Sequence, residues 1–205
     1  MNDSPGASAE DVARELADAL EACGVDYAVG GALGLAQWGV IRGTLDVDMN
    51  IWLDPGHPME VADLLHQLGC DFKAGPVVRE FTDKRWAYVF RRGVHVDIYL
   101  PTSQFHESVR QRRQRKPLCG RDAWFLAPED LAVFKLIFYR AKDRADVEAL
   151  LVIRGREFDR QYARGWLERI LGPSDLRLKT WDELIIQADA AIHLRESGWS
   201  PPLSQ

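Results

Sequence analysis

The segment from Arg42 to Leu53 alternates between polar and apolar residues, and two of its polar residues are aspartates. Successive side chains of a strand point to opposite faces. Asp46 and Asp48 would therefore share one face, and Val47 and Met49 the other. Two carboxylates about 7 Å apart on one face repel each other unless a cation lies between them. The pattern predicts a half-buried strand whose polar face binds a metal ion.

An Asp-x-Asp triplet alone is a weak signal, because a solvent-exposed strand face often carries two acids by chance. Its neighbours strengthen the interpretation. A short strand over 25–29 runs into Gly30-Gly31, and a helix is expected over 32–40. Such a junction leaves backbone N–H groups without side-chain bulk around them, which suits a phosphate. A later strand, Gly93 to Leu100, adds a third acid on its polar face.

The motifs occur in this order along the chain: Gly30-Gly31, then Arg42-x-Thr44-x-Asp46-x-Asp48, then Asp97. In this order they resemble the nucleotidyltransferase superfamily typified by DNA polymerase beta. Two stretches follow: Leu126-Ala-Pro-Glu-Asp-Leu-Ala-Val-Phe-Lys135 and Arg140-Ala-Lys-Asp143-Arg-Ala-Asp146-Val-Glu-Ala-Leu150. They resemble the small bacterial branch that includes the abortive-infection type toxin nucleotidyltransferases and their uncharacterised relatives. Together the motifs cover about residues 25 to 151, and Gly31 stands where many members have serine.

The resemblance implies a magnesium-dependent enzyme that transfers an NMP group from an NTP, such as ATP, to a hydroxyl acceptor and releases pyrophosphate. Asp46 and Asp48 would bind two Mg²⁺ ions, and Asp97 would hold one ion beside the attacking hydroxyl and help remove its proton. These three acids are thus the expected catalytic residues and metal ligands, and oxygen ligands suit magnesium. Loss of either strand acid is expected to lower activity by several orders of magnitude.

Five residues are expected to bind the nucleotide: Gly30, Gly31, Arg42, Thr44 and Lys135. Arg42 and Thr44 precede the metal strand, where they would contact phosphate or orient Asp46. Ordinary turn chemistry at Arg42-Gly43 is the alternative for this pair.

Lys135 lies at the margin of an apolar helix face and is expected to reach the triphosphate. Its alternative role is to cover apolar surface with its aliphatic stem. Asp143 opens the next helix, where an acid is favoured by the helix dipole without any catalysis. It is expected to be a structural or site-organising residue that pairs with Lys135 or Arg140, and Asp146 ranks below it.

A basic cluster follows a short helix that begins near Ser103, and its members are Arg110, Arg112, Arg113, Arg115 and Lys116. On one interpretation these residues form a solvated helix end and loop, since cations are favoured at a helix C-terminus. On the other they receive the triphosphate or an RNA acceptor such as tRNA. The net charge of −5 does not by itself indicate a nucleic-acid binder.

The order of elements predicts an α+β (mixed α/β) nucleotidyltransferase fold, with a mixed sheet flanked by helices and a C-terminal helical segment. The expected divisions are a disordered leader at 1–8, a core at 9–126, a helical segment packed on the core at 127–198, and a tail at 199–205. Strands are expected at 25–29, 45–53, 71–81, 86–91 and 94–100, with a strand pair at 118–126. Helices are expected at 9–23, 32–40, 58–68, 128–140, 142–153, 157–171 and 175–196.

With 205 residues, 46% of them hydrophobic, the chain is long enough to bury a core. It has no apolar run near the roughly 20 residues of a membrane span, and its acidic start, Met1 to Asp11, lacks the pattern of a signal peptide. A cytoplasmic protein without membrane contact is expected. Its three cysteines and five histidines are scattered, which favours neither a disulfide framework nor a zinc site.

Three functions remain open at this point. The first is nucleotidyl transfer to tRNA, protein or a small molecule, including the action of a toxin that has an antitoxin protein as partner. The second is a catalytically inactive relative that binds a nucleotide or a partner. The third is a two-metal hydrolase, which would share the carboxylates but would not require the glycine pair.

Overall fold

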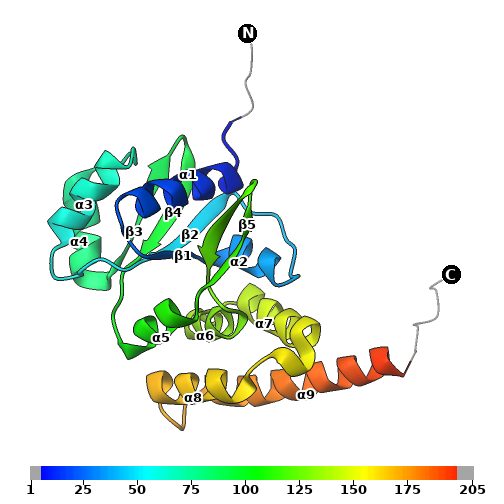
Figure 1. Cartoon of the computed structure of the whole chain (residues 1–205). Coiled ribbons are helices and arrows are strands. Elements are labelled where there is room, and N and C mark those ends of the chain that lie inside the picture. Colours follow the sequence, from blue (N-terminus) through cyan, green and yellow to red (C-terminus); the bar gives the residue numbers. More distant parts are fainter. Residues whose placement is uncertain (1–5, 198–205) are drawn as a thin grey trace. The chain divides into compact units, whose positions relative to one another are not determined.

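The computed structural model describes residues 6–197, which fall into two compact units (Figure 1). The sheet unit holds Ile41–Ala127 and the described residues up to Gln37, and the helical unit holds Trp38–Val40 and the described residues from Pro128. The expected tail at 199–205 and residues 1–5 of the expected leader lie outside the described residues. Packing of the helical segment on the core stays a prediction.

The described part of the sheet unit contains one six-stranded sheet in the order β3-β4-β2-β1-β6-β5. Strand β2 runs parallel to β4 and β1 parallel to β6, whereas the other neighbours are antiparallel. The expected mixed sheet is therefore confirmed. Its strands are β1 (Tyr27–Val29), β2 (Asp46–Ile51), β3 (Trp86–Arg91), β4 (Val94–Tyr99), β5 (Gln114–Leu118) and β6 (Arg121–Phe125).

Two tight hairpins connect the antiparallel pairs β3–β4 and β5–β6. Arg92 and Gly93 have φ of 51° and 80°, and Cys119 and Gly120 have φ of 47° and 82°. Positive φ at both central residues is the requirement of a type I′ turn. The first turn connects the strands expected at 86–91 and 94–100, whereas β5 begins four residues before the strand pair expected at 118–126.

Helices of the sheet unit are α1 (Ala9–Ala22), α2 (Gly31–Gln37), α3 (Pro58–Gln67), α4 (Ala74–Lys84) and α5 (Gln104–Arg112). Figure 1 shows α1 lying across the sheet, with α3 and α4 beside it. Apolar residues of these three helices form one core with the inward side chains of β2, β3 and β4, Val47 and Met49 among them. The strand alternation therefore leaves Asp46 and Asp48 on the opposite face.

One predicted strand is wrong, because most of 71–81 belongs to helix α4. Val77 and Phe81 are its buried residues, and they lie four positions apart on one helical face. Pro76 falls in the first turn, where proline is tolerated. The buried residues of this stretch follow the helical period and not the two-residue alternation of a strand. Asp71 forms a single antiparallel bridge with Phe90.

The helical unit follows the predicted pattern closely. Its helices are α6 (Pro128–Phe138), α7 (Ala141–Arg154), α8 (Arg160–Leu171) and α9 (Leu176–Glu196), with a 3₁₀ turn at Gly155–Glu157. Helix α8 starts three residues later than predicted, because the 3₁₀ turn comes first and the side chain of Asp159 caps the helix. In the part of the chain described here, no helix has the length and apolarity to cross a membrane.

Candidate active site

Three aspartates lie on one face of two neighbouring parallel strands. Asp46 and Asp48 are on β2 and Asp97 is on β4, with Asp48 opposite Asp97 and Asp46 opposite His95. Neighbouring strands lie about 4.8 Å apart. The alternation of both strands and their parallel register therefore bring together the three acids that the sequence selected.

Charge is concentrated at this face. The Asp97 side chain is 19% exposed, against 59% for Asp46. Burial raises the pKa of Asp97, and the negative charges of Asp48 and Asp46 raise it further. His95 and Trp86 act in the opposite direction without reversing the shift. A cation would relieve this repulsion.

His95 lies between two of the acids. Its Nδ1 is 3.8 Å from an Asp46 oxygen and 3.9 Å from Oδ1 of Asp97. These separations exceed hydrogen-bond distance. Both His95 Nδ1 and Asp97 Oδ1 are buried atoms without a hydrogen-bond partner among the described residues.

The donor set fits magnesium. Directly paired positions on neighbouring strands have Cβ atoms about 5 Å apart, so carboxylates at these positions can reach one ion. The oxygen donors suit a hard cation, and Asp97 Oδ1 accepts no hydrogen bond from the described residues. Within residues 6–197, no three His, Cys, Asp or Glu side chains already stand in metal-binding positions.

The glycine pair is in direct contact with the carboxylate strand. Gly30 donates its N–H to the carbonyl oxygen of Asp48 at 2.8 Å. Gly31 has φ of 53°, and a Cβ atom built on it would overlap the carboxylate of Asp48. Glycine is therefore favoured at this position for two reasons, backbone conformation and space.

Thr44 organises the start of β2. Its hydroxyl donates to the carbonyl oxygen of Asp46 at 3.0 Å and accepts from the Asp46 N–H at 3.2 Å. These bonds fix the Thr44 side chain to the backbone of Asp46. Arg42 is half-buried. Contact of either residue with phosphate stays a prediction.

Lys135 belongs to a buried ion-pair cluster in the helical unit. Its Nζ is 2.6 Å from Asp146 Oδ2 and 3.3 Å from Asp143 Oδ1. Arg140 contacts Asp143 Oδ2 through Nε at 2.7 Å and through its backbone N–H at 3.0 Å. Asp143 therefore pairs with both residues that the sequence proposed for it. The shorter Lys135 contact is to Asp146, which the sequence ranked lower.

The charges around Asp143 decide its ionisation. Burial alone would raise its pKa, but hydrogen bonds from Arg140 and the charge of Lys135 outweigh burial and lower it. Asp143 is thus held as a carboxylate by its own neighbours. The role of Lys135 at a triphosphate stays a prediction.

Three arginines of the basic cluster form ion pairs within the sheet unit. Arg110 and Arg113 both pair with Asp26, and Arg115 contacts Glu21 at 3.2 Å. Arg115 and Lys116 lie on β5, so the expectation that they form a helix end and loop is wrong. The reason is that α5 ends at Arg112 and the chain then pairs with β6. These contacts give the three arginines a structural role.

Comparison with known proteins gives similarity at the level of structure. No family model matches the chain, and no curated protein sequence matches it significantly. An antigenic nucleotidyltransferase-like protein from Paracoccidioides brasiliensis is 17% identical and covers 84% of this chain and 93% of its own (TM-score 0.46). The lincomycin-bound lincosamide antibiotic adenylyltransferase LnuA is 14% identical and covers 72% and 99% (TM-score 0.46).

The antibiotic-resistance factor ANT(2'')-Ia aligns better over nearly the whole length of both chains. It covers 93% of this chain and 97% of its own, with 9% identity and a TM-score of 0.52. The chain has the nucleotidyltransferase fold. At these identities the likeness concerns the fold alone, and it confirms the fold expected from the order of the sequence motifs.

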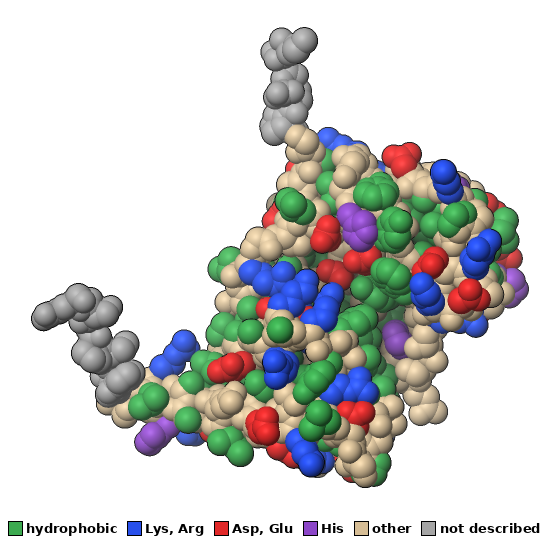
Figure 2. Space-filling model, turned by 180° about the vertical axis from the view of Figure 1, so that it is seen from behind, with side chains coloured by type: hydrophobic (Ala, Val, Ile, Leu, Met, Phe, Trp, Pro, Cys, Tyr) green, Lys and Arg blue, Asp and Glu red, His purple; other side chains and the backbone are tan. Residues whose placement is uncertain are grey.

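Several aromatic residues on the acidic face of this nucleotidyltransferase fold were given no role by the sequence. Tyr88 pairs with Asp97 and Phe90 with His95 across the β3–β4 hairpin. Figure 2 shows red acidic, purple histidine and green apolar side chains close together on the sheet unit. Alternation along 86–91 was the signal that could have placed the aromatic residues beside Asp97.

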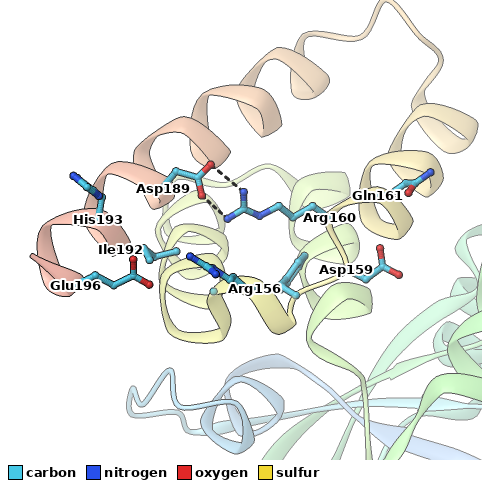
Figure 3. Close-up of a pocket in the computed structure, with 10 residues that line it drawn as sticks. Arg156, Asp159, Arg160, Gln161, Asp189, Ile192, His193 and Glu196 are labelled. Atoms are coloured by element: carbon cyan, nitrogen blue, oxygen red, sulfur yellow. Dashed lines mark hydrogen bonds and ion pairs between the residues drawn. The ribbon is translucent and has the colours of Figure 1, made fainter.

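The helical unit has a pocket of its own, with a volume of about 590 Å³ (Figure 3). Arg160 and Asp189 face each other across it in a two-bond ion pair at 3.0 and 2.6 Å. None of the site residues selected from the sequence lines it. The pocket is therefore a separate feature of the helical unit.

Proposed function

We propose that the protein is a magnesium-dependent nucleotidyltransferase that moves an NMP group from a nucleoside triphosphate to a hydroxyl acceptor. One observation carries the proposal. Asp46, Asp48 and Asp97 share one face of neighbouring strands in a nucleotidyltransferase fold, with the Asp48 carboxylate against Gly31. Such a concentration of negative charge beside a glycine pair supports a site for cations and phosphates.

The same three aspartates would hold two magnesium ions. Two observations support this assignment: Asp97 Oδ1 is buried without a hydrogen-bond partner among the described residues, and the pKa of Asp97 is raised. When bound, magnesium supplies charge neutralisation for the phosphates and stabilises the attacking and leaving oxygens.

The chain itself would position the reactants. The acceptor hydroxyl oxygen forms a bond to the α-phosphorus, and the bond from that phosphorus to the bridging oxygen breaks, so pyrophosphate leaves. Asp97 would accept the hydroxyl proton on a carboxylate oxygen. Gly30 and Gly31 would admit the phosphates close to the backbone, and Arg42 and Thr44 would contact them.

Lys135 would add a cation to the triphosphate site. Its ammonium group has three donors, and Asp143 and Asp146 face two of them. The third would serve a phosphate oxygen. Asp143 would organise this group by holding Lys135 and Arg140 together.

The test is label transfer. Each α-labelled NTP is incubated with the protein, Mg²⁺ and either total tRNA or a cell extract that contains proteins and small molecules. We expect transfer that needs Mg²⁺, disappears in Asp46→Ala and persists in Asp63→Ala. Asp63 is an exposed acid on α3, which packs on the opposite face of the sheet, and is the matched control.

Other outcomes would replace the proposal. Nucleotide binding without transfer would indicate an inactive relative, and hydrolysis of phosphate esters without NTP would indicate a two-metal hydrolase. Absence of both Mg²⁺ and nucleotide binding in calorimetry would remove the basis of the proposal. A toxin role with an antitoxin partner further requires that expression arrests growth and that Asp46→Ala relieves the arrest.

A further inference from the structure

We infer that the outer face of the β3–β4 hairpin binds the acceptor, and that the acceptor is a small molecule with a flat ring next to its reactive hydroxyl. The surface in question, the ring platform, consists of Tyr88, Phe90 and His95. The inference rests on the proposed function, since it assigns the second substrate of that site.

The three rings of the platform support one another and remain accessible. Tyr88 stacks on His95 with centroids 5.0 Å apart, and Phe90 contacts His95 edge-on at 5.6 Å. Tyr88 and Phe90 also meet edge-to-face at 5.9 Å. Even so, Tyr88 is 50% exposed and Phe90 is 40% exposed. Adjacent exposed aromatic rings form the kind of surface on which a ligand ring stacks.

The platform lies on the acceptor side of the acids. In the sheet order β3-β4-β2-β1, the glycine pair follows β1, the acids are on β2 and β4, and the platform begins on β3. The nucleotide phosphates are proposed to lie at the glycine pair. A group that approaches Asp97 from the other side meets Tyr88, the residue paired with Asp97.

The chemistry of this face favours a small molecule over a nucleic acid. Its alternating residues on β3 and β4 are Trp86, Tyr88, Phe90, His95, Asp97 and Tyr99, with neither lysine nor arginine among them. Lys84, whose Nζ lies 6.0 Å from the Trp86 ring centroid, is paired with Glu80 at 2.9 Å. Arg91 of β3 belongs to the opposite face and pairs with Glu15 of α1. A nucleic-acid backbone requires cations for its phosphates, whereas an uncharged ring requires only an apolar, planar surface.

Further cations of the sheet unit are already engaged. Arg110 and Arg113 are bound to Asp26, and Arg115 to Glu21. These ion pairs are intramolecular contacts that a phosphate backbone would have to displace. The observations therefore favour a ring-bearing alcohol as the acceptor.

The experiment uses two glycosides and the double variant Tyr88→Ser/Phe90→Ser. The probes are 4-nitrophenyl β-D-glucopyranoside, which carries a flat ring beside its sugar hydroxyls, and methyl β-D-glucopyranoside, which does not. Binding is measured by calorimetry and saturation-transfer NMR with the full chain in Mg²⁺. Met59→Ser, at an exposed apolar residue of α3, is the control.

We expect the wild type and Met59→Ser to bind the nitrophenyl glycoside about tenfold more tightly than the methyl glycoside. The double variant should lose this preference and retain NTP binding. The inference is overturned if the double variant binds the nitrophenyl glycoside like the wild type, or if the wild type shows no preference. It is also overturned if the wild type binds tRNA and the double variant does not. Loss of NTP binding in the double variant also overturns it, because the rings would then hold the nucleotide base.

Failure of the inference and failure of the proposed function are distinguishable. If the wild type binds NTP and transfers label in an Asp46-dependent way, the proposed function stands whatever the glycosides do. If the wild type binds neither Mg²⁺ nor NTP, the proposed function fails and the acceptor assignment fails with it.

Discussion

The pKa of an aspartate is raised at the acidic face of the sheet unit and lowered in the Lys135 cluster of the helical unit. Asp97 faces Asp48 and Asp46, and its pKa is raised. Asp143 has a fully buried side chain, yet its pKa is lowered, because Arg140 and Lys135 surround it. Burial acts in the same direction at both sites, so the charge of the neighbours decides the outcome. A cation would have to be added to neutralise the acidic face, whereas the Lys135 cluster contains its own cations.

The largest effect is expected at the acidic face. Asp48→Asn keeps the size of the side chain but removes one of the charges proposed to bind magnesium. We expect label transfer to fall by about a thousandfold, with thermal stability in the absence of metal unchanged or increased. Steady-state transfer rates and thermal unfolding in EDTA are the measurements. Asp63→Asn should change neither, and transfer within tenfold of the wild type would contradict the proposed site.

A large loss of stability is expected in the Lys135 cluster. Asp143→Ala leaves Lys135 without one of its two buried partners, and breaking a buried ion pair costs about 3–5 kcal/mol. The control is Asp182→Ala, which removes an exposed partner of Arg164 and should cost less than about 1 kcal/mol. Urea unfolding measures both. Similar free energies of unfolding for the two variants would show that burial makes no difference here.

Glycine substitutions test the link between the glycine pair and the carboxylate strand. Gly31→Ala and Gly24→Ala both place a side chain at positive φ, at 53° and 67°, with a backbone strain of about 1–2 kcal/mol each. Only the Cβ at position 31 also displaces the Asp48 carboxylate, since Gly24 has open space around it. Transfer should therefore decrease in Gly31→Ala alone. Equal transfer by the two variants would mean that the position of Asp48 is not critical.

The smallest expected effect is a pH-dependent change in melting temperature. A raised pKa of Asp97 in the folded state means that its contribution to stability is present below the ordinary value of 3.8 and is lost as pH rises through the raised value. In EDTA, Asp97→Asn should therefore increase the melting temperature at pH 7 by about 2 °C, a gain that shrinks as pH falls toward 4.

For Asp143→Asn we expect the opposite change in melting temperature. Its lowered pKa stabilises the folded state above 3.8, so this variant should melt at a lower temperature than the wild type at pH 7. Thermal scans from pH 4 to 7 measure both variants. If Asp97→Asn also lowers the melting temperature at neutral pH, the proposed repulsion at the acidic face is wrong.

Local periodicity in the sequence was sufficient to predict much of the fold. Alternation placed Asp46 and Asp48 on one strand face, and helical spacing gave α6 to α9 within a few residues. The strand expected at 71–81 was wrong, because Val77 and Phe81 of α4 are buried with helical spacing. Intrinsic preference is a weak guide where burial against a core decides the conformation.

The candidate site likewise has features that the sequence predicted and features that only the tertiary structure revealed. The sequence by itself determined which acids share a face, because the two-residue repeat of a strand is a local property. Only the tertiary structure decided that Asp48 lies opposite Asp97, that Tyr88 borders the acids, and that Asp146 holds Lys135. Strand register and helix packing join residues far apart in the chain, and no local pattern specifies such contacts.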